Sequence, residues 1–241
     1  MSPAIPGTVQ VRTTLPRRPL PPNPSRAAIA TARLTARPLR PGDLAGYGLL
    51  RAQPEVMAFT AAGRVDRDAA ETQSKLDLFL APNDARTFNF AICLGEGAGG
   101  DDGELIGVGG VHIFGDGRGW PEVGYMLKRE YWGRGYATEF LRGFVGAWWA
   151  LEREEAVVHV DGQSLVADTS ENGRTGEEHE PRPATECLTA VVEASNESSI
   201  RVMEKTGFRK FKTWAEPDSR AGMEGKDITL VGFLLERNCS R

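Results

Sequence analysis

The sequence predicts an α/β protein with a mixed sheet and helices on both faces. The predicted elements follow the order β-α-α-β-β-β-α-β-α-β-β, which is neither a strict alternation of strands and helices nor a run of strands alone. The second observation is a stretch with two glycines, residues 131–138, that joins a predicted strand to a predicted helix. Because open sheets bind ligands at strand ends where the chain crosses over, we expect a crevice between the strands at Glu122 and Cys187.

The composition is that of a soluble globular protein, with 40% apolar and 26% charged residues among 241. The formal net charge of −4 gives no reason to expect a nucleic-acid partner. No stretch approaches the ~20 apolar residues needed to span a bilayer. Three distant cysteines, Cys93, Cys187 and Cys239, show neither a disulfide framework nor the spacing of a zinc site. We therefore expect a reducing compartment, the cytoplasm, and no metal or membrane partner.

Two segments differ from the rest in composition. Residues 1 to about 27 are rich in proline and arginine, which favours an extended arm, packed along the domain or disordered. The absence of acidic residues before Asp43 raises the alternative of a targeting leader, against which the prolines argue. Residues 161–183 are polar and acidic and are expected to form a mobile insertion. The chain is thus divided into an arm, residues 1–27, and one domain, residues 28–241, that carries the insertion.

The first half of the domain is expected to hold one strand, two helices and three further strands. Loose alternation marks the first strand, and Asp43 stands where a helix begins. The pattern Asp68-Ala-Ala-Glu71 is that of a capping box. A glycine-rich turn joins two of the later strands into a hairpin. The expected elements are a strand at 31–39, helices from 43 through 50 and from 68 to 80, and strands at 87–94, 105–114 and 122–127.

The second half is expected to hold two helices and three strands. Apolar residues recur at steps of three and four from Ala137 to Leu151, the spacing of one buried helix face. A second helix is expected to begin at Asn196, a suitable N-cap, and to end at Gly207 in a left-handed conformation. The expected strands are 186–193, 208–214 and 228–235, the last two as a hairpin, and residues 157–160 are left open as a further short strand.

The loop between strand and helix has the composition of an anion site. Gly133 and Gly135 flank Arg134, and glycines let backbone N–H groups approach a ligand closely. The helix that follows adds unpaired N–H groups and the positive end of its dipole. These features indicate a phosphate site, although two glycines at such a junction also make an ordinary tight turn.

Three segments agree in sequence and order with one known family. They read Glu122-Val-Gly-Tyr-Met-Leu, Tyr131-Trp-Gly-Arg-Gly-Tyr-Ala-Thr-Glu139 and Asn196-Glu-Ser-Ser-Ile-Arg-Val-Met-Glu-Lys-Thr-Gly-Phe208. Together they resemble the GNAT superfamily of acetyl-CoA-dependent N-acetyltransferases. The resemblance implies a single domain whose mixed, mostly antiparallel sheet is splayed at its centre. It covers about residues 28–158 and 184–236.

The resemblance implies acetyl-CoA as co-substrate and assigns its contacts. The backbone of Met126 and Leu127 would pair with the pantetheine arm and polarise the thioester carbonyl. Asn196 and Ser199 match polar positions across the crevice, and each is alternatively a helix cap. The residues expected to hold the pyrophosphate through backbone N–H groups are Trp132, Gly133, Arg134, Gly135, Tyr136, Ala137 and Thr138.

Two positions depart from the family pattern. Glu130 stands where many members have Gln or Arg, so we expect it to point away and Arg134 or Arg129 to supply positive charge. Met203 stands where many members have a tyrosine general acid, and a thioether cannot donate a proton. The leaving thiolate would then take its proton from Ser199, from water, or from no donor at all.

Glu122 is the expected general base, at the position of the family's usual base. A carboxylate accepts the amine proton directly or through water, best when burial raises its pKa. The alternative is a solvated strand carboxylate. His112 is a second candidate, although a lone histidine on a strand is more often structural. Tyr125 and Trp132 are expected either to line the acceptor slot or to belong to the core.

The sequence therefore predicts an acetyl-CoA-dependent N-acetyltransferase, monomeric or homodimeric, that acts by direct attack of a primary amine in a ternary complex. The acceptor is a protein N-terminus, a lysine or a small amine, and is expected to depend on residues 44–80 and 216–227. Residues 31–39 resemble the branch that acetylates ribosomal-protein N-termini. Two alternatives stay open: a coenzyme-binding protein without catalysis, and an interaction protein that docks through its arm and insertion.

Overall fold

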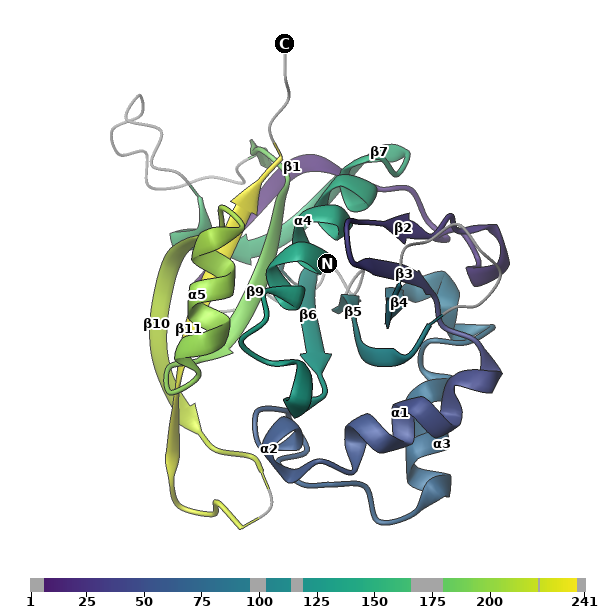
Figure 1. The fold of residues 1–241 in the computed structure, drawn as a ribbon. Coiled ribbons are helices and arrows are strands. Elements are labelled where there is room, and N and C mark those ends of the chain that lie inside the picture. Colours follow the sequence, from purple (N-terminus) through teal and green to yellow (C-terminus); the bar gives the residue numbers. More distant parts are fainter. Residues whose placement is uncertain (1–6, 96–102, 114–118, 166–179, 221, 238–241) are drawn as a thin grey trace.

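The computed structural model describes residues 7–95, 103–113, 119–165, 180–220 and 222–237 (Figure 1). An eight-stranded sheet has the order β10-β11-β9-β6-β5-β4-β3-β2, and a three-stranded sheet the order β7-β1-β8. The strands are β1 (Thr8–Pro16), β2 (Ile29–Ala30), β3 (Leu34–Pro38), β4 (Phe88–Leu94), β5 (Leu105–Ile113), β6 (Glu122–Leu127), β7 (Arg153–Asp161), β8 (Arg182–Pro183), β9 (Cys187–Glu193), β10 (Arg209–Pro217) and β11 (Asp227–Glu236). The helices are α1 (Leu44–Arg51), α2 (Pro54–Met57), α3 (Ala69–Asp77), α4 (Tyr136–Trp149) and α5 (Glu197–Lys205).

The large sheet opens at its centre. Its neighbouring strands run antiparallel except β6 and β9, which are parallel. Their ladder consists of one pair, Glu122 with Thr189, and the two strands separate beyond it. This mixed, mostly antiparallel and centrally splayed sheet confirms the predicted fold class.

Helices cover both faces of the large sheet. On one face, α4 buries Phe144 and Trp148 against Phe90 and its neighbours in the main core. On the other face, α1, α2 and α3 pack around Tyr47, with Met126 of β6 at the edge of this second core. Burying each such side chain contributes about 1.5–3 kcal/mol, so the two cores hold the sheet from both sides.

Most expected elements are present, with small differences in their bounds. The first expected strand is the shorter β3, preceded by β2, and the short strand suggested at 157–160 is the second half of β7. The hairpins β4–β5 and β10–β11 are confirmed, although residue 114 lies outside the described residues. The helix α2 was not predicted from the sequence, because four residues are too few to show a helical period. No described helix is long and apolar enough to cross a membrane.

The segment expected as an arm is extended and contains β1. This strand pairs with β7 from Thr8 to Pro16, and it buries Val11 and Leu15 beside Trp120 in a third core. Of the expected insertion, residues 166–179 lie outside the described residues, and β8 beyond them pairs with β1. The small sheet thus joins the N-terminal segment to both flanks of the insertion.

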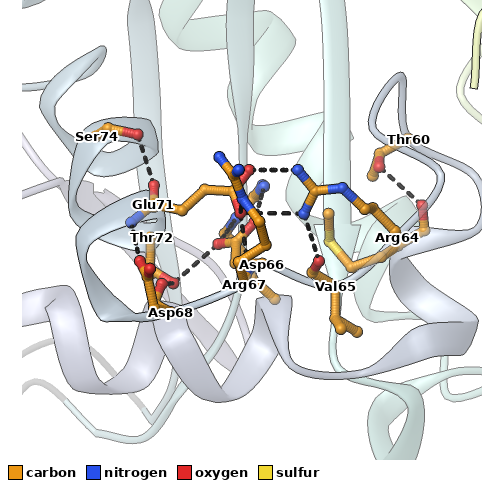
Figure 2. A network of polar contacts seen from close by, with 11 residues as sticks. Thr60, Arg64, Val65, Asp66, Arg67, Asp68, Glu71, Thr72 and Ser74 are labelled. Atoms are coloured by element: carbon orange, nitrogen blue, oxygen red, sulfur yellow. Dashed lines mark hydrogen bonds and ion pairs between the residues drawn. The ribbon is translucent and has the colours of Figure 1, made fainter. Parts of the chain in front are cut away.

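The capping pattern before α3 is only half formed. Asp68 accepts from the N–H of Glu71 at 2.8 Å, as predicted. The Glu71 carboxylate, however, accepts from the N–H of Arg67 at 2.7 Å and pairs with Arg64 at 2.7 Å (Figure 2). Beside it, Asp66 accepts from the hydroxyl of a threonine of α3 at 2.9 Å. The connection between α2 and α3 is therefore fixed by ion pairs.

Candidate functional site

The opening between β6 and β9 exposes one row of backbone groups. The N–H of Lys128 donates to the carbonyl of Ile106 across the antiparallel pair of β6 and β5. Because bonded residues alternate along such a ladder, the N–H and C=O of Met126 also point to β5. Those of Tyr125 and Leu127 point to β9, which has already separated. This geometry corrects one expectation: an extended ligand would pair with Tyr125 and Leu127, and not with Met126.

The loop after β6 turns into α4 through two left-handed glycines. Gly133 has φ 71° and Gly135, the N-cap of α4, has φ 82°, conformations that favour glycine. A Cβ on Gly133 would meet no atom within 4 Å, so the surface of the loop is open. The first turn of α4 leaves the N–H groups of Tyr136, Ala137 and Thr138 without helical partners. This is the geometry that an anion site requires.

Side chains fix the start of this loop. The indole of Trp132 donates to the carbonyl of Leu127 at 2.7 Å, and the residue as a whole is 41% exposed, outside the core. Lys128 is buried and pairs with Glu104 at 2.7 Å, and the hydroxyl of Tyr131 donates to the same carboxylate at 2.6 Å. These contacts hold the loop against the end of β6.

Arg33, in the turn between β2 and β3, braces the loop from the other side. Its guanidinium donates to the carbonyl of Arg134 at 3.1 Å and pairs with Glu139 at 2.7 Å. It also lies 4.4 Å from the centre of the Tyr136 ring. The Glu139 carboxylate, which would repel an anion at the helix start, is thereby paired with a cation.

An open depression of about 650 Å³ lies beside the loop. Its cations are Arg33, Arg142 of α4 and Lys205 of α5. Arg142 donates to the carbonyl of Lys205 at 3.0 Å, which ties the two helices together. None of these three residues was predicted from the sequence, because they come from separate elements. The one available signal was the position of Thr138 and Arg142 on one face of α4. The depression suits a ligand with several phosphate groups.

The two arginines expected to supply positive charge near Glu130 lie in different surroundings. Glu130 accepts from the amide of Gln53 at 2.9 Å, so its carboxylate is turned to the segment before α2. Arg129 is paired with Glu55 at 2.6 Å. Arg134 lies 5.7 Å from the ring of Tyr131 within the loop itself. Of the two arginines named from the sequence, Arg134 is therefore the one that lies in the loop.

The start of α5 faces β6 across the opening. Asn196 caps this helix, since its Oδ1 accepts from the N–H of Ser199 at 3.1 Å. The hydroxyl of Tyr125 donates to Ser199 Oγ at 3.1 Å. Burial raises the pKa of Tyr125, and the hydrogen bond to Ser199 opposes that shift. Tyr125 thus lies on the face of the sheet that packs against α4 and α5, and not in an acceptor slot. Met203 of α5 is buried in the main core.

Glu122 and His112 meet on the opposite face, because side chains alternate along β6. Glu122 Oε1 lies 3.7 Å from His112 Nε2, at the point where β6 and β9 still pair. Burial raises the pKa of Glu122 to about 7. Burial also lowers the pKa of His112, against a hydrogen bond with the backbone of Gly110. At neutral pH the histidine is neutral and the carboxyl is divided between its two forms, the condition of a poised general base.

Neither a metal cluster nor a reactive thiol is found among the described residues. They contain no group of three His, Cys, Asp or Glu side chains that could hold a metal ion. Cys93 and Cys187 are buried, and burial raises the pKa of the Cys187 thiol to about 12.

Comparisons with known proteins agree with this geometry. The sequence profile described as an acetyltransferase (GNAT) domain matches residues 33–209. No curated protein matches the chain.

Solved structures of similar fold include three acetyltransferases. The first is a probable GNAT-family acetyltransferase from Chromobacterium violaceum, with 14% identity over 98% of this chain and 94% of that one, at a TM-score of 0.60. RimJ from Mycobacterium smegmatis, in complex with CoA-disulfide, has 19% identity over 84% and 81%, at 0.54. Spermidine N-acetyltransferase from Vibrio cholerae, in complex with CoA and spermine, has 14% identity over 86% and 96%, at 0.56. With a family profile that covers more than half of its length, the chain belongs to the GNAT acetyltransferases.

Proposed function

We propose that this chain moves the acetyl group of acetyl-CoA to a primary amine by direct attack in a ternary complex. The observation that carries the proposal is the placement of Glu122, whose pKa of about 7 suits a general base. It stands at the narrow end of the β6–β9 opening, on the face opposite to Tyr125 and Ser199. A proton acceptor and a hydroxyl donor therefore flank the place that a thioester in this opening would occupy.

The coenzyme would enter from the side of α4 and α5. The N–H groups of residues 133–138 would bind its pyrophosphate, whereas that of Trp132, expected to share this role, already donates to the carbonyl of Arg129. Arg142 and Lys205 would bind a further phosphate group of coenzyme A. The pantetheine arm would pair with the exposed backbone of Tyr125 and Leu127 like an added strand. An N–H group of this row would polarise the thioester carbonyl.

In the proposed reaction, Glu122 acts from one face of the sheet and the Tyr125–Ser199 pair from the other. Glu122 takes a proton from the acceptor ammonium, and the neutral nitrogen attacks the thioester carbon to form a tetrahedral oxyanion. Collapse of this oxyanion breaks the C–S bond, and the departing thiolate takes a proton from the Tyr125–Ser199 pair, which bulk water then restores. The nitrogen, positively charged since its attack, loses its second proton to water and becomes the neutral amide, and Glu122 returns its proton to solvent before the next turnover. The donor that the sequence analysis could not find at Met203 is thus offered by Tyr125, from β6 and not from α5.

The acceptor class is a primary amine of a protein N-terminus, a lysine or a small molecule. RimJ and spermidine N-acetyltransferase share the fold with this chain at 19% and 14% identity, a likeness that does not select between protein and polyamine acceptors. Membership of the ribosomal-protein branch, suggested by residues 31–39, and a cytoplasmic location remain predictions.

The test is acetylation of an amine panel by the full chain with acetyl-CoA, followed by mass spectrometry. Glu122→Gln should lower turnover by ~10² or more, the usual weight of one general base. Its affinity for acetyl-CoA, measured by calorimetry, should stay unchanged, because the coenzyme contacts lie elsewhere. Glu152→Gln, the same change at an exposed carboxylate, is the matched control. Coenzyme binding without transfer to any amine would reduce the chain to a binding protein.

A further inference from the structure

Arg220 joins three separate segments of the chain. From the loop between β10 and β11, its guanidinium binds Asp218 at 2.6 Å and Glu193, the last residue of β9, at 2.9 Å. It also donates to the carbonyl of Ala58, just after α2, at 2.6 Å. The side chain of Arg220 is 14% exposed and that of Asp218 is 5% exposed. In Figure 1 this loop hangs beside α2 at the lower end of the molecule.

The segment that Arg220 contacts is itself held firmly. Asp66, further along the connection to α3, pairs with Arg51 of α1 at 2.6 Å, with both side chains more than nine-tenths buried. Arg64 is tied to Glu71 in the network of Figure 2. Between them and α2, a Cβ on Gly63 would stand only 2.7 Å from Arg220 Cβ. The contact with Arg220 is therefore close, and ion pairs hold the connection between α2 and α3 in place on the other side of it.

The same segment is tied to the end of β6. Gln53, just before α2, donates to Glu130 at 2.9 Å and accepts from the N–H of Arg129 at 2.7 Å. A continuous line of contacts thus runs from the carboxyl end of β6, through α2, to Arg220 and the carboxyl end of β9. We call this line, residues 53–58 together with Arg220, the Arg220 bridge. It spans β6 and β9 where the two strands have separated.

Glu122 and the bridge lie at the two ends of one strip of sheet. Thr189, Val191 and Glu193 share the face of β9 that is turned away from the main core. Thr189 pairs with Glu122, and Glu193 pairs with Arg220. Between them Val191 is 38% exposed, and its neighbour across the β9–β11 pair is a glycine. Val191 is thus an exposed apolar residue midway between the bridge and the general base, and Thr189 beyond it is buried beside Glu122.

The other end of this strip is closed. Cys187 and Leu234, on the same face as Thr189, are buried under the small sheet together with Trp120. Lys212 of β10 pairs with Asp161 at the end of β7 at 2.6 Å. Arg220 is paired with two carboxylates beside the bridge, those of Glu193 and Asp218, so its positive charge does not repel an ammonium group. An amine that reached Glu122 along β9 would pass beneath the bridge.

We propose that Arg220 determines the acceptor: its bridge admits a slender, cationic primary alkylamine, free or at the end of a flexible chain, and excludes an amine on a bulky or rigid surface. This inference rests on the proposed function of the Glu122 site. Residues 44–80 and 216–227 are the segments expected from the sequence to select the acceptor. Arg220 is the contact by which the second segment is fastened to the first.

A thiol probe under the bridge tests this access without any need for activity. Val191→Cys is introduced into the full chain with Cys239→Ser, since Cys93 and Cys187 are buried. Methyl methanethiosulfonate is the slender reagent, and a methanethiosulfonate with a nitroxide ring is the bulky one. Adding Arg220→Gln should speed the bulky reagent by about tenfold or more, because loss of a charged hydrogen bond shifts an opening equilibrium by at least this factor. The slender reagent should react at an unchanged rate.

Two further variants keep the test decisive. Gly63→Ala, which displaces Arg220 from the opposite side, should reproduce the result if Arg220→Gln folds poorly. Arg209→Gln, whose partner Glu236 lies at the far end of the same hairpin, should change neither rate. Equal acceleration of both reagents, or of neither, would overturn the proposal.

Acetylation of the amine panel then measures the effect of Arg220 on the choice of acceptor. Arg220→Gln should raise kcat/KM for branched and aromatic amines relative to an unbranched diamine, and should raise KM for the diamine, while the affinity for acetyl-CoA stays constant. Unchanged selectivity would also overturn the proposal. A wild-type chain that acetylates no amine would refute the proposed function instead, and the thiol rates would still decide whether the bridge limits access.

Discussion

Replacing Glu122 with glutamine is expected to stabilise the protein at alkaline pH and to leave its stability unchanged at acidic pH. Burial raises the pKa of this carboxyl from its ordinary 4.5 to about 7, so the folded state holds the proton more tightly than the unfolded chain does. The stability that this proton contributes is complete below pH 4.5 and is lost as the pH rises to about 7. Glutamine has the shape of the neutral acid and does not titrate, so it loses nothing over this range.

The size of the effect follows from the two pKa values. At 1.36 kcal/mol per pKa unit, a change from 4.5 to about 7 corresponds to about 3 kcal/mol. The Glu122 side chain is 25% exposed, and water that reaches the carboxylate reduces this figure to about 1–2 kcal/mol. For a chain of this length, that difference raises the Tm by about 2–8 °C at alkaline pH.

Urea unfolding of both proteins across the range from pH 4.5 to about 8 measures the difference directly. The advantage of Glu122→Gln should grow from nearly zero to its full value as the pH rises. Glu152→Gln, at an exposed carboxylate, should show no such rise. If the difference between Glu122→Gln and wild type is independent of pH, the carboxyl is not buried as described, and the reasoning that makes it a general base fails with it.

Three further changes are expected to have distinct outcomes. Gly135→Glu should abolish binding of acetyl-CoA in calorimetry, because a side chain and a negative charge would stand at the left-handed N-cap of α4; unchanged affinity in a folded variant would show the phosphate cradle to be misplaced. Tyr125→Phe should lower kcat by about tenfold or more with little change in KM, and an unaltered kcat would remove the Tyr125–Ser199 pair from the proton path. Arg51→Met should cost about 3–5 kcal/mol in urea unfolding, since it leaves Asp66 buried without its cation, and a loss below 1 kcal/mol would mean that water reaches this carboxylate.

Elements with a local signal were predictable from the sequence. Both ends of the helix α5 are marked by residue type: Asn196 is its N-cap, and Gly207, with φ 88°, follows its last turn. The hairpin β4–β5 and the glycine loop likewise depend on residues that are close in sequence. Gly133 and Gly135 have the positive φ values that a strand-to-helix turn of this kind demands. The predicted fold class follows from such elements.

Features that depend on distant contacts were not predictable in the same way. The direction of the backbone groups in β6 depends on its register with β5. The sequence alone therefore could not show that the backbone groups of Tyr125, rather than those of Met126, point toward the opening. Arg33 and Lys205 reach one depression from opposite parts of the chain. The raised pKa of Glu122 results from its surroundings and not from its neighbours in sequence.

The small sheet sets an order in which the chain can fold. Its strand β1 pairs Thr8 with Asp161 and Pro16 with Arg153, so its partner lies more than half of the chain away. During synthesis the first strand stays without its partner while the hairpin β4–β5 and α4 are already complete. Closing so long a loop is slow compared with closing a hairpin, and the third core therefore assembles late. The buried end of the strip beside Glu122, where Cys187 and Leu234 lie under the small sheet, is therefore complete only after β1 has paired with β7.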